Sequence, residues 1–170
     1  MPIARATNHL ITVNAFPGDA KTLLAFDLVT ESARHRLAGF TIEVHAPGHT
    51  AYFVDNNLRF APSPDHAQLG AESPFASVNA PIAQFRWVHV PGLVHQAGTP
   101  TFGTYTYVVT PRYFSDRAAL QPLDPAASVA VTVEVGPFAT GAMKLGFTRG
   151  CWFRRRPRCR RAARRPRVGW

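Results

Sequence analysis

The side chains of this chain that are best suited to acid–base chemistry or metal binding are its seven histidines: His9, His35, His45, His49, His66, His89 and His95. His45 and His49 are four residues apart, a spacing that places two metal ligands on one face of a helix. Pro47 and Gly48 lie between them and prevent that helix, because an interior proline lacks a backbone donor and clashes with the preceding turn. We therefore expect scattered surface or turn histidines and no metal site.

Motifs of the common catalytic classes are absent from the sequence. It contains no G-x-S-x-G elbow, no S-x-x-K, no H-E-x-x-H and neither of the two glycine-rich phosphate loops. Lys21 and Lys144 are the only lysines, and neither has a histidine two positions before it. The acidic residues are too dispersed to form a carboxylate pair. We expect no catalytic site and no cofactor; the alternative, a hydrolase built from isolated His, Ser and Asp residues, has no spacing to support it.

The elements that position these side chains are strands, because apolar and polar residues alternate in short runs. The runs cover residues 9–13, 23–29, 40–44, 85–90, 104–110, 129–135 and 143–147. Proline and glycine separate them and leave no long helical window in the second half of the chain, although residues 31–37 and 116–120 can each form a turn or two of helix. The pattern predicts an all-β fold, an antiparallel β-sandwich of the immunoglobulin or fibronectin type with about seven to eight strands.

The same alternation predicts the direction of individual side chains. We expect Glu43 and His89 on the outer faces of their strands, and Pro111 at the end of the strand that begins at residue 104. Core and hairpin packing is the first expectation for five aromatic residues, and contact with a partner is the alternative. These residues are Trp87, Tyr105, Tyr107, Tyr113 and Phe114.

Residues 55–81 interrupt the strand pattern. This stretch carries four prolines and many small polar residues, and only Leu58 and Phe60 resemble strand positions. A loop of this length in a compact domain is either functional or loosely ordered. The sequence leaves both readings open.

The charge of the chain divides sharply at residue 150. Residues 1–150 contain 8 Arg, 2 Lys and 10 acidic residues and are therefore neutral, whereas residues 151–170 contain 9 Arg and no acidic residue. The whole net charge of +9 thus belongs to the last twenty positions. We divide the chain into a β-sandwich module, residues 1–150, and an arginine-rich tail, residues 151–170.

The arginine-rich tail has two explanations. Its charge suits non-specific binding to nucleic acid or to anionic lipid, and its low apolar content predicts disorder. Alternatively, a segment of Arg, Ala, Pro, Gly, Cys and Trp is what GC-rich DNA encodes out of frame, and we favour this origin because the composition breaks abruptly after Gly150. Cys151 and Cys159 lack the spacing and the further ligands of a zinc site.

The composition of residues 1–150 bounds the class of protein. The chain is 46% hydrophobic, and this length fits one globular domain with a hydrophobic core. No apolar run approaches the ~20 residues of a membrane-spanning helix, and the first residues contain no continuous apolar segment of a secretory signal. We expect a cytoplasmic protein without a transmembrane segment.

Three segments of the module resemble the N-terminal region of bacterial phospholipase D-like proteins: Ala80–Gly92, Gly103–Phe114 and Leu145–Gly150. In that family the third segment leads into a catalytic part with H-x-K-x-x-x-x-D motifs, in which the histidine attacks a phosphodiester. This chain contains no H-x-K, so no catalytic residue of the family can be carried over. The resemblance implies a non-catalytic accessory module, truncated before the catalytic part, with that missing part as its partner.

Overall fold

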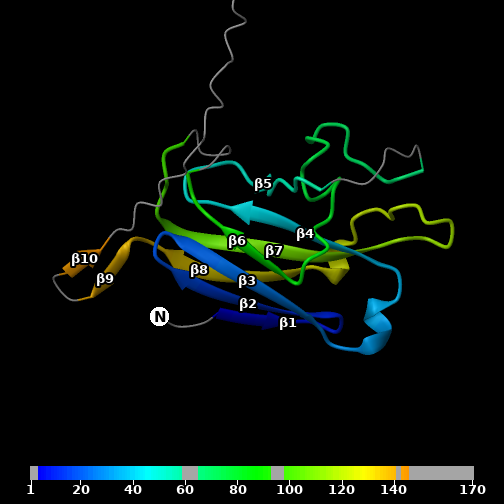
Figure 1. The fold of residues 1–170 in the computed structure, drawn as a ribbon, viewed down its shortest axis with the longest axis horizontal. Coiled ribbons are helices and arrows are strands. Elements are labelled where there is room, and N and C mark those ends of the chain that lie inside the picture. The colour runs from blue at the N-terminus through cyan, green and yellow to red at the C-terminus, as the bar shows by residue number, and fades with distance from the viewer. Residues whose placement is uncertain (1–3, 59–64, 93–97, 141–142, 146–170) are drawn as a thin grey trace, which may run out of the picture.

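Among the described residues, two antiparallel sheets of four strands each form the body of the protein, and Figure 1 shows how they are arranged. The computed structural model describes residues 4–58, 65–92, 98–140 and 143–145. The first sheet has the order β1 (Ala4–Thr7), β2 (Ile11–Gly18), β3 (Lys21–Leu28) and β6 (Arg86–His89). The second has the order β5 (Tyr52–Phe53), β4 (Leu37–His45), β7 (Gly103–Tyr113) and β8 (Val129–Val135). The prediction of an all-β antiparallel sandwich is confirmed.

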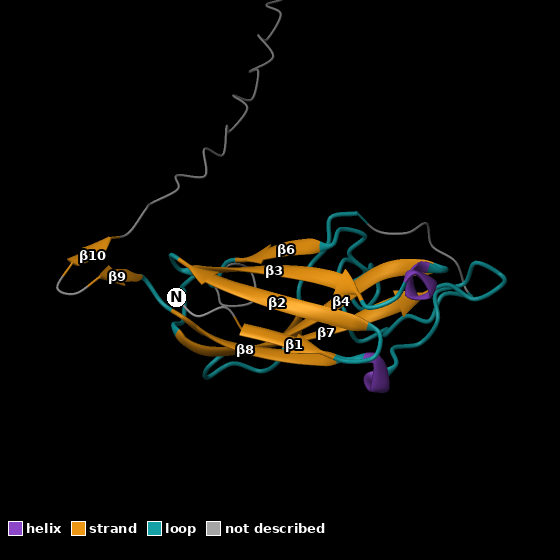
Figure 2. Ribbon diagram, turned by 90° about the horizontal axis from the view of Figure 1, so that it is seen from below, coloured by secondary structure: helices purple, strands orange, loops and turns teal. Residues whose placement is uncertain are grey.

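Four short elements complete the described fold. Strands β9 (Phe138–Thr140) and β10 (Met143–Leu145) pair with each other, and the 3-10 helices η1 (Glu31–Arg34) and η3 (Pro125–Ala127) precede β4 and β8. Figure 2 distinguishes the strands from these two small helices. Within the described residues, no helix combines the length and the apolar character that a membrane crossing requires.

Alternation of side chains builds the core. In β8 the four valines are buried while Ala130, Thr132 and Glu134 are exposed, because successive side chains of a strand point to opposite faces. Each fully buried valine, leucine or phenylalanine contributes about 1.5–3 kcal/mol from removal of apolar surface from water. The largest apolar members of the core include Ile11, Leu24, Phe26, Phe40, Ile42 and Val44.

The strand order is the Greek-key order of immunoglobulin-type sandwiches, in which the chain repeatedly crosses between the sheets. A tyrosine corner accompanies it: near the start of β7, the Tyr105 hydroxyl donates to the backbone oxygen of Thr101, four residues earlier, at 2.6 Å. The edges β6 and β5 lie on the same side of the sandwich, since side chains from both meet across the core. At the opposite side, Asn8 donates to the carbonyl of Ala127 at 3.0 Å and so joins the end of β1 to the start of β8.

The prediction that Pro111 ends its strand was wrong, because β7 continues to Tyr113. Pro111 lies opposite Phe40, whose backbone groups bond to Ile82 on the other side of β4. The backbone nitrogen of Pro111 therefore points away from β4, toward the side of β7 on which β8 lies. The pairing of β7 with β8 ends at Val109, before Pro111. Proline has no backbone N–H to donate, so it is tolerated at a position where no carbonyl of a neighbouring strand needs that donor.

The strand pattern missed three short elements: β1, β5 and β9. Each has at most four residues, and none lies within a longer alternating run of the kind that contains β6 and β10. Of the two expected helical turns, residues 31–34 form η1, whereas the second segment is a non-helical turn closed by a bond from the Ser115 amide to the Ala119 carbonyl.

Candidate functional site

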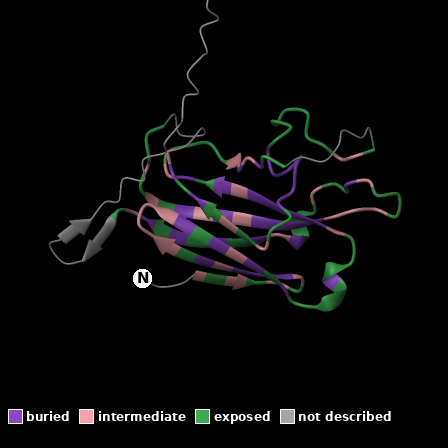
Figure 3. Ribbon diagram, viewed as in Figure 1, coloured by how far each residue is buried: buried purple, intermediate pink, exposed green. Residues whose placement is uncertain are grey.

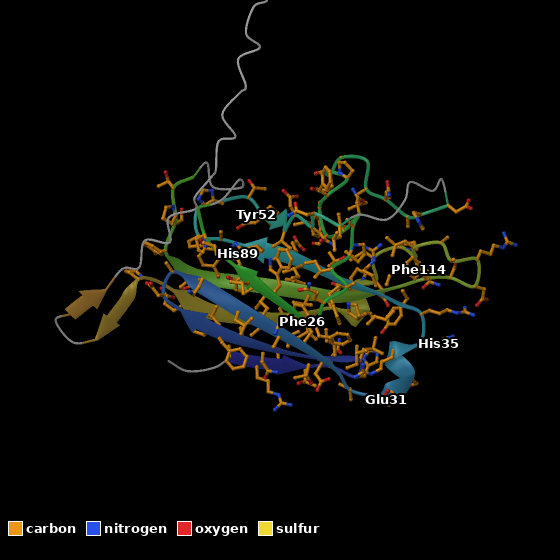
Figure 4. All side chains as sticks on the ribbon, viewed as in Figure 1. Phe26, Glu31, His35, Tyr52, His89 and Phe114 are labelled. Atoms are coloured by element: carbon orange, nitrogen blue, oxygen red, sulfur yellow. The ribbon has the colours of Figure 1, made fainter. Side chains whose placement is uncertain are left out.

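A histidine enclosed by two tyrosines lies between the two sheets. The His89 side chain of β6 contacts the Tyr52 hydroxyl of β5 through Nε2, at 3.0 Å, and the Tyr107 hydroxyl of β7 through Nδ1, at 2.9 Å. Figure 4 labels His89 and Tyr52 among the surrounding side chains. We expected His89 on an outer face, and that prediction was wrong: His89 pairs with the buried Thr22 and shares its inward direction. Apolar residues occupy both faces of β6, so alternation alone could not identify the inner one.

We call His89, Tyr52 and Tyr107 the histidine cluster. Both ring nitrogens of His89 form hydrogen bonds within this cluster. In its neutral form the imidazole has one donor and one acceptor nitrogen, and two phenol hydroxyls, each able to donate or accept, match that pair. Burial raises the pKa of the Tyr107 phenol well above its ordinary value of 10.0, which keeps this phenol neutral. The cluster thus joins three strands of two sheets.

The remaining described histidines lie where scattered surface or turn residues were predicted. His9, His35, His45 and His49 are exposed, and His45 Nε2 lies 3.4 Å from Glu43 on the outer face where Glu43 was expected. Nδ1 of His66 accepts a hydrogen bond from the Leu120 amide at 2.9 Å. His95, Cys151, Cys159 and the tail arginines lie outside the described residues. In the described ranges, no three His, Cys, Asp or Glu side chains gather as metal ligands would.

Residues near the end of the 55–81 loop bond to β4 on the side where β5 pairs with only Glu43 and Val44. Ser77 Oγ accepts from the Ile42 amide at 3.0 Å and donates to the Ile42 carbonyl at 3.1 Å. Thr41 Oγ1 donates to the Ser77 carbonyl at 3.0 Å, and the Ile82 and Phe40 backbones exchange two hydrogen bonds of 2.9 Å. This loop therefore occupies the position of an additional strand beside β4.

Two buried asparagines hold the rest of this loop. Nδ2 of Asn79 donates to the carbonyls of Leu69 and Ser73, both at 3.0 Å, and Oδ1 accepts from the Leu69 amide at 2.7 Å. Asn56 Nδ2 donates to the carbonyls of residues 80 and 81. Leu58, expected in a strand, is instead 77% exposed and outside any strand, and Phe60 lies outside the described residues. These hydrogen bonds attach the described part of the loop to its own backbone and to the segment that leads into β6.

A buried arginine locks the loop onto the second sheet. Arg112 of β7 donates from Nη1 to the Val78 carbonyl at 2.7 Å and from Nη2 to the Gln121 carbonyl at 2.6 Å. Nη1 also lies 3.2 Å from Thr41 Oγ1. Desolvation lowers the pKa of Arg112 to about 10, so the guanidinium remains charged at neutral pH. Its planar fork reaches acceptors in two separate loops, which a lysine could not do.

The close approach of the loop to β4 depends on a glycine. Gly39 has a φ of +142°, and a Cβ at this position would lie 2.6 Å from the Ile82 carbonyl oxygen. Beside it is an open hollow of about 250 Å³ whose walls include Arg34, Ala83 and Phe85. The Arg34 guanidinium lies 5.4 Å from the centre of the Phe85 ring, a cation–π contact that forms part of the wall.

The aromatic residues largely follow the expectation of core packing. Tyr105 and Tyr107 are fully buried and their rings stack with centroids 6.2 Å apart. Trp87 is half-buried against the core, and Tyr113 and Phe114 are half-buried at the end of β7.

The outer face of the first sheet carries an apolar row that crosses three strands. Phe16 of β2 pairs with Leu23 of β3, and Leu23 pairs with Val88 of β6. Their relative exposures are 37%, 37% and 51%, and Figure 3 shows the bands of buried and exposed residues along these strands. We call these three side chains the outer row. Nothing in its sequence spacing could have revealed it, because the three residues come from separate strands.

Basic side chains flank the outer row on the same face. Lys21 lies two residues before Leu23, and the next cross-strand row contains Arg5 at one edge and Arg86 at the other, connected through Asn14 and Ala25. Residues two apart on a strand share a face and are about 7 Å apart. The outer face thus combines an apolar strip with three basic side chains, and Asp27, two residues after Ala25 on β3, places one carboxylate on the same face.

The comparisons with family models, curated proteins and solved structures give no match.

Proposed function

We propose that residues 1–150 form a non-catalytic accessory module of the kind that precedes the catalytic part of phospholipase D-like proteins. One observation carries this proposal: the buried side chains that could take part in chemistry are occupied by hydrogen bonds that connect strands and loops. His89 joins the two sheets through Tyr52 and Tyr107, and Arg112 and Asn79 hold loops by their carbonyls. Groups committed in this way stabilise a binding scaffold.

The positions of the family-like segments support the same proposal. Ala80–Gly92 contains β6, and Gly103–Phe114 contains β7 together with its tyrosine corner. These segments supply sheet pairing and core residues of the sandwich module. The third segment, Leu145–Gly150, lies mostly outside the described residues.

An activity assay tests the non-catalytic role. Purified protein is incubated with lipid and nucleic-acid phosphodiesters, with and without divalent metal, and we expect no turnover. Turnover that persists at constant specific activity through successive purification steps would overturn the proposal. Translation of the DNA after codon 150 in the other two frames tests the family assignment, because an H-x-K-x-x-x-x-D motif there would support it.

The charge of the tail favours a second function, binding of nucleic acid or an anionic surface through residues 151–170. Nine arginines without an acidic residue can neutralise several phosphates and release their counterions. Deletion of residues 151–170 should then abolish binding to a DNA duplex, and the affinity of the full chain should fall steeply with salt. Binding that survives the deletion would exclude this function.

A further inference from the structure

Within the described residues, strand β6 is one of the two edges of the first sheet. It pairs with β3 on one side, and the sheet order ends with it. The Phe26 amide donates to the Phe85 carbonyl at 2.8 Å, so in this ladder Trp87 and His89 also direct their backbone groups toward β3. The amides and carbonyls of Arg86 and Val88 consequently point away from the sheet, and no described residue bonds to them. Such an edge is a template for one more strand.

The side chains beside these free backbone groups define what such a strand should carry. Val88 ends the outer row, so an apolar residue opposite Val88 would extend the contact with Leu23 and Phe16 by one strand. Arg86 is exposed on the same face, two residues earlier. A carboxylate opposite Arg86 would pair with it, because opposite charges in facing positions stabilise a ladder.

Charge complementarity selects between a second copy of the chain and a different partner. Residues 85–90 contain Arg86 and no acidic residue, so β6 of a second copy brings no carboxylate to this edge. Lys21 and Arg86 lie in the rows on either side of the Leu23–Val88 pair, and their charge likewise favours an acidic partner. An extended acidic segment of another protein is therefore the occupant that fits.

We propose that β6 binds an extended peptide segment as an additional antiparallel strand, with an apolar residue opposite Val88 and, two positions later, an acidic residue opposite Arg86. The antiparallel direction fixes the order apolar-x-acidic. Backbone hydrogen bonds to Arg86 and Val88 supply affinity, and the two side chains supply specificity. This inference deepens the proposed accessory role by naming the chemistry of a partner.

The test uses the full chain and a short peptide with capped ends. The peptide consists of threonine residues, apart from one valine and, two positions later, one glutamate. We expect saturable binding, with amide NMR shifts concentrated at Arg86 and Val88 and absent at Arg5 on the opposite edge. N-methylation of the peptide valine should weaken binding by about tenfold or more, because it removes a strand donor without altering the protein. Retained affinity after N-methylation would overturn strand addition.

Two matched controls separate the edge from general electrostatics. Arg86→Glu should weaken binding about fivefold, and a peptide with lysine in place of glutamate should recover the loss. Arg5→Glu makes the same charge change in the same cross-strand row at the far edge and should have little effect. An equal loss with Arg5→Glu would overturn the proposal.

A peptide with glutamate first and valine two positions later has the same net charge and measures any attraction to the tail arginines. It should bind more weakly than the valine-first peptide; equal binding of both orders overturns the register. Dimerisation that depends on β6 and excludes the peptide would assign the edge to a second copy instead. Failure of peptide binding leaves the non-catalytic role standing, whereas phosphodiesterase turnover removes that role and leaves strand addition intact.

Discussion

Nδ1 of His89 and the hydroxyl of Tyr107 lie 2.9 Å apart and connect β6 of one sheet to β7 of the other. The Tyr52 hydroxyl of β5 forms a hydrogen bond with the second ring nitrogen, Nε2. A single imidazole therefore connects three strands. The contact is made inside an apolar core, where an unpaired polar group is costly. The stability of the sandwich should therefore be sensitive to this cluster.

His89→Leu is predicted to lower the free energy of unfolding by about 2–4 kcal/mol, because the buried Tyr107 hydroxyl and the half-buried Tyr52 hydroxyl each lose a hydrogen bond to the imidazole. Denaturant unfolding followed by tryptophan fluorescence measures the change. His9→Ala, at an exposed position, is the matched control and should stay within about 0.5 kcal/mol of wild type. Unchanged stability of the leucine variant would mean that the two phenols are satisfied without the histidine.

The buried Tyr107 phenol predicts a loss of stability in alkali. Its pKa is raised in the folded state, so its contribution is fully present below the unfolded value of 10.0 and is lost as the pH rises toward the folded value. The slope for one proton is at most about 1.4 kcal/mol per pH unit.

Comparison of wild type with Tyr107→Phe isolates this contribution. Arg112 acts with the opposite sign, since its lowered pKa of about 10 makes the folded state lose a proton first, but it is common to both proteins. Above pH 10, the free energy of unfolding of wild type should fall relative to that of Tyr107→Phe. A difference independent of pH would contradict the raised pKa.

Arg112→Met should lower the free energy of unfolding by about 2–4 kcal/mol and expose the loop at residues 65–82 to protease, because the carbonyls of Val78 and Gln121 lose their donor. Chymotryptic cleavage near Phe75, followed by mass spectrometry, reports on the loop. Arg117→Met removes an exposed arginine nearby and should leave both readouts unchanged.

Asn79→Asp preserves side-chain shape and should still destabilise the protein by about 3 kcal/mol, because an oxygen replaces the amide nitrogen that donates to the Leu69 and Ser73 carbonyls. Thermal and denaturant unfolding measure the effect. Asn57→Asp makes the same change at an exposed position and should be nearly neutral. Equal behaviour of the two variants would show that Asn79 is not the anchor of this loop.

Gly39→Ala should destabilise the protein by more than about 3 kcal/mol, because the new Cβ would meet the Ile82 carbonyl at 2.6 Å in a backbone conformation that favours glycine. Gly70→Ala, where a Cβ meets no atom within 4 Å, is the control and should be tolerated. Denaturation midpoints of the two variants provide the comparison.

The sequence by itself determined the class of fold and most strands. Valines at alternate positions of residues 129–135 can bury one face only as a strand, and the prolines between such runs exclude long helices. The division of charge between residues 1–150 and 151–170 is also a property of the sequence alone.

Tertiary structure decided the direction of ambiguous strands and every contact between distant residues. His89 lies in a strand with apolar residues on both faces, so only pairing with Thr22 and packing on Tyr107 fixed it inward. The outer row and the Arg112 anchor unite residues from separate strands and loops, and local periodicity carries no information about such partners. The outer row and the Arg112 anchor form only when folding brings these strands and loops together.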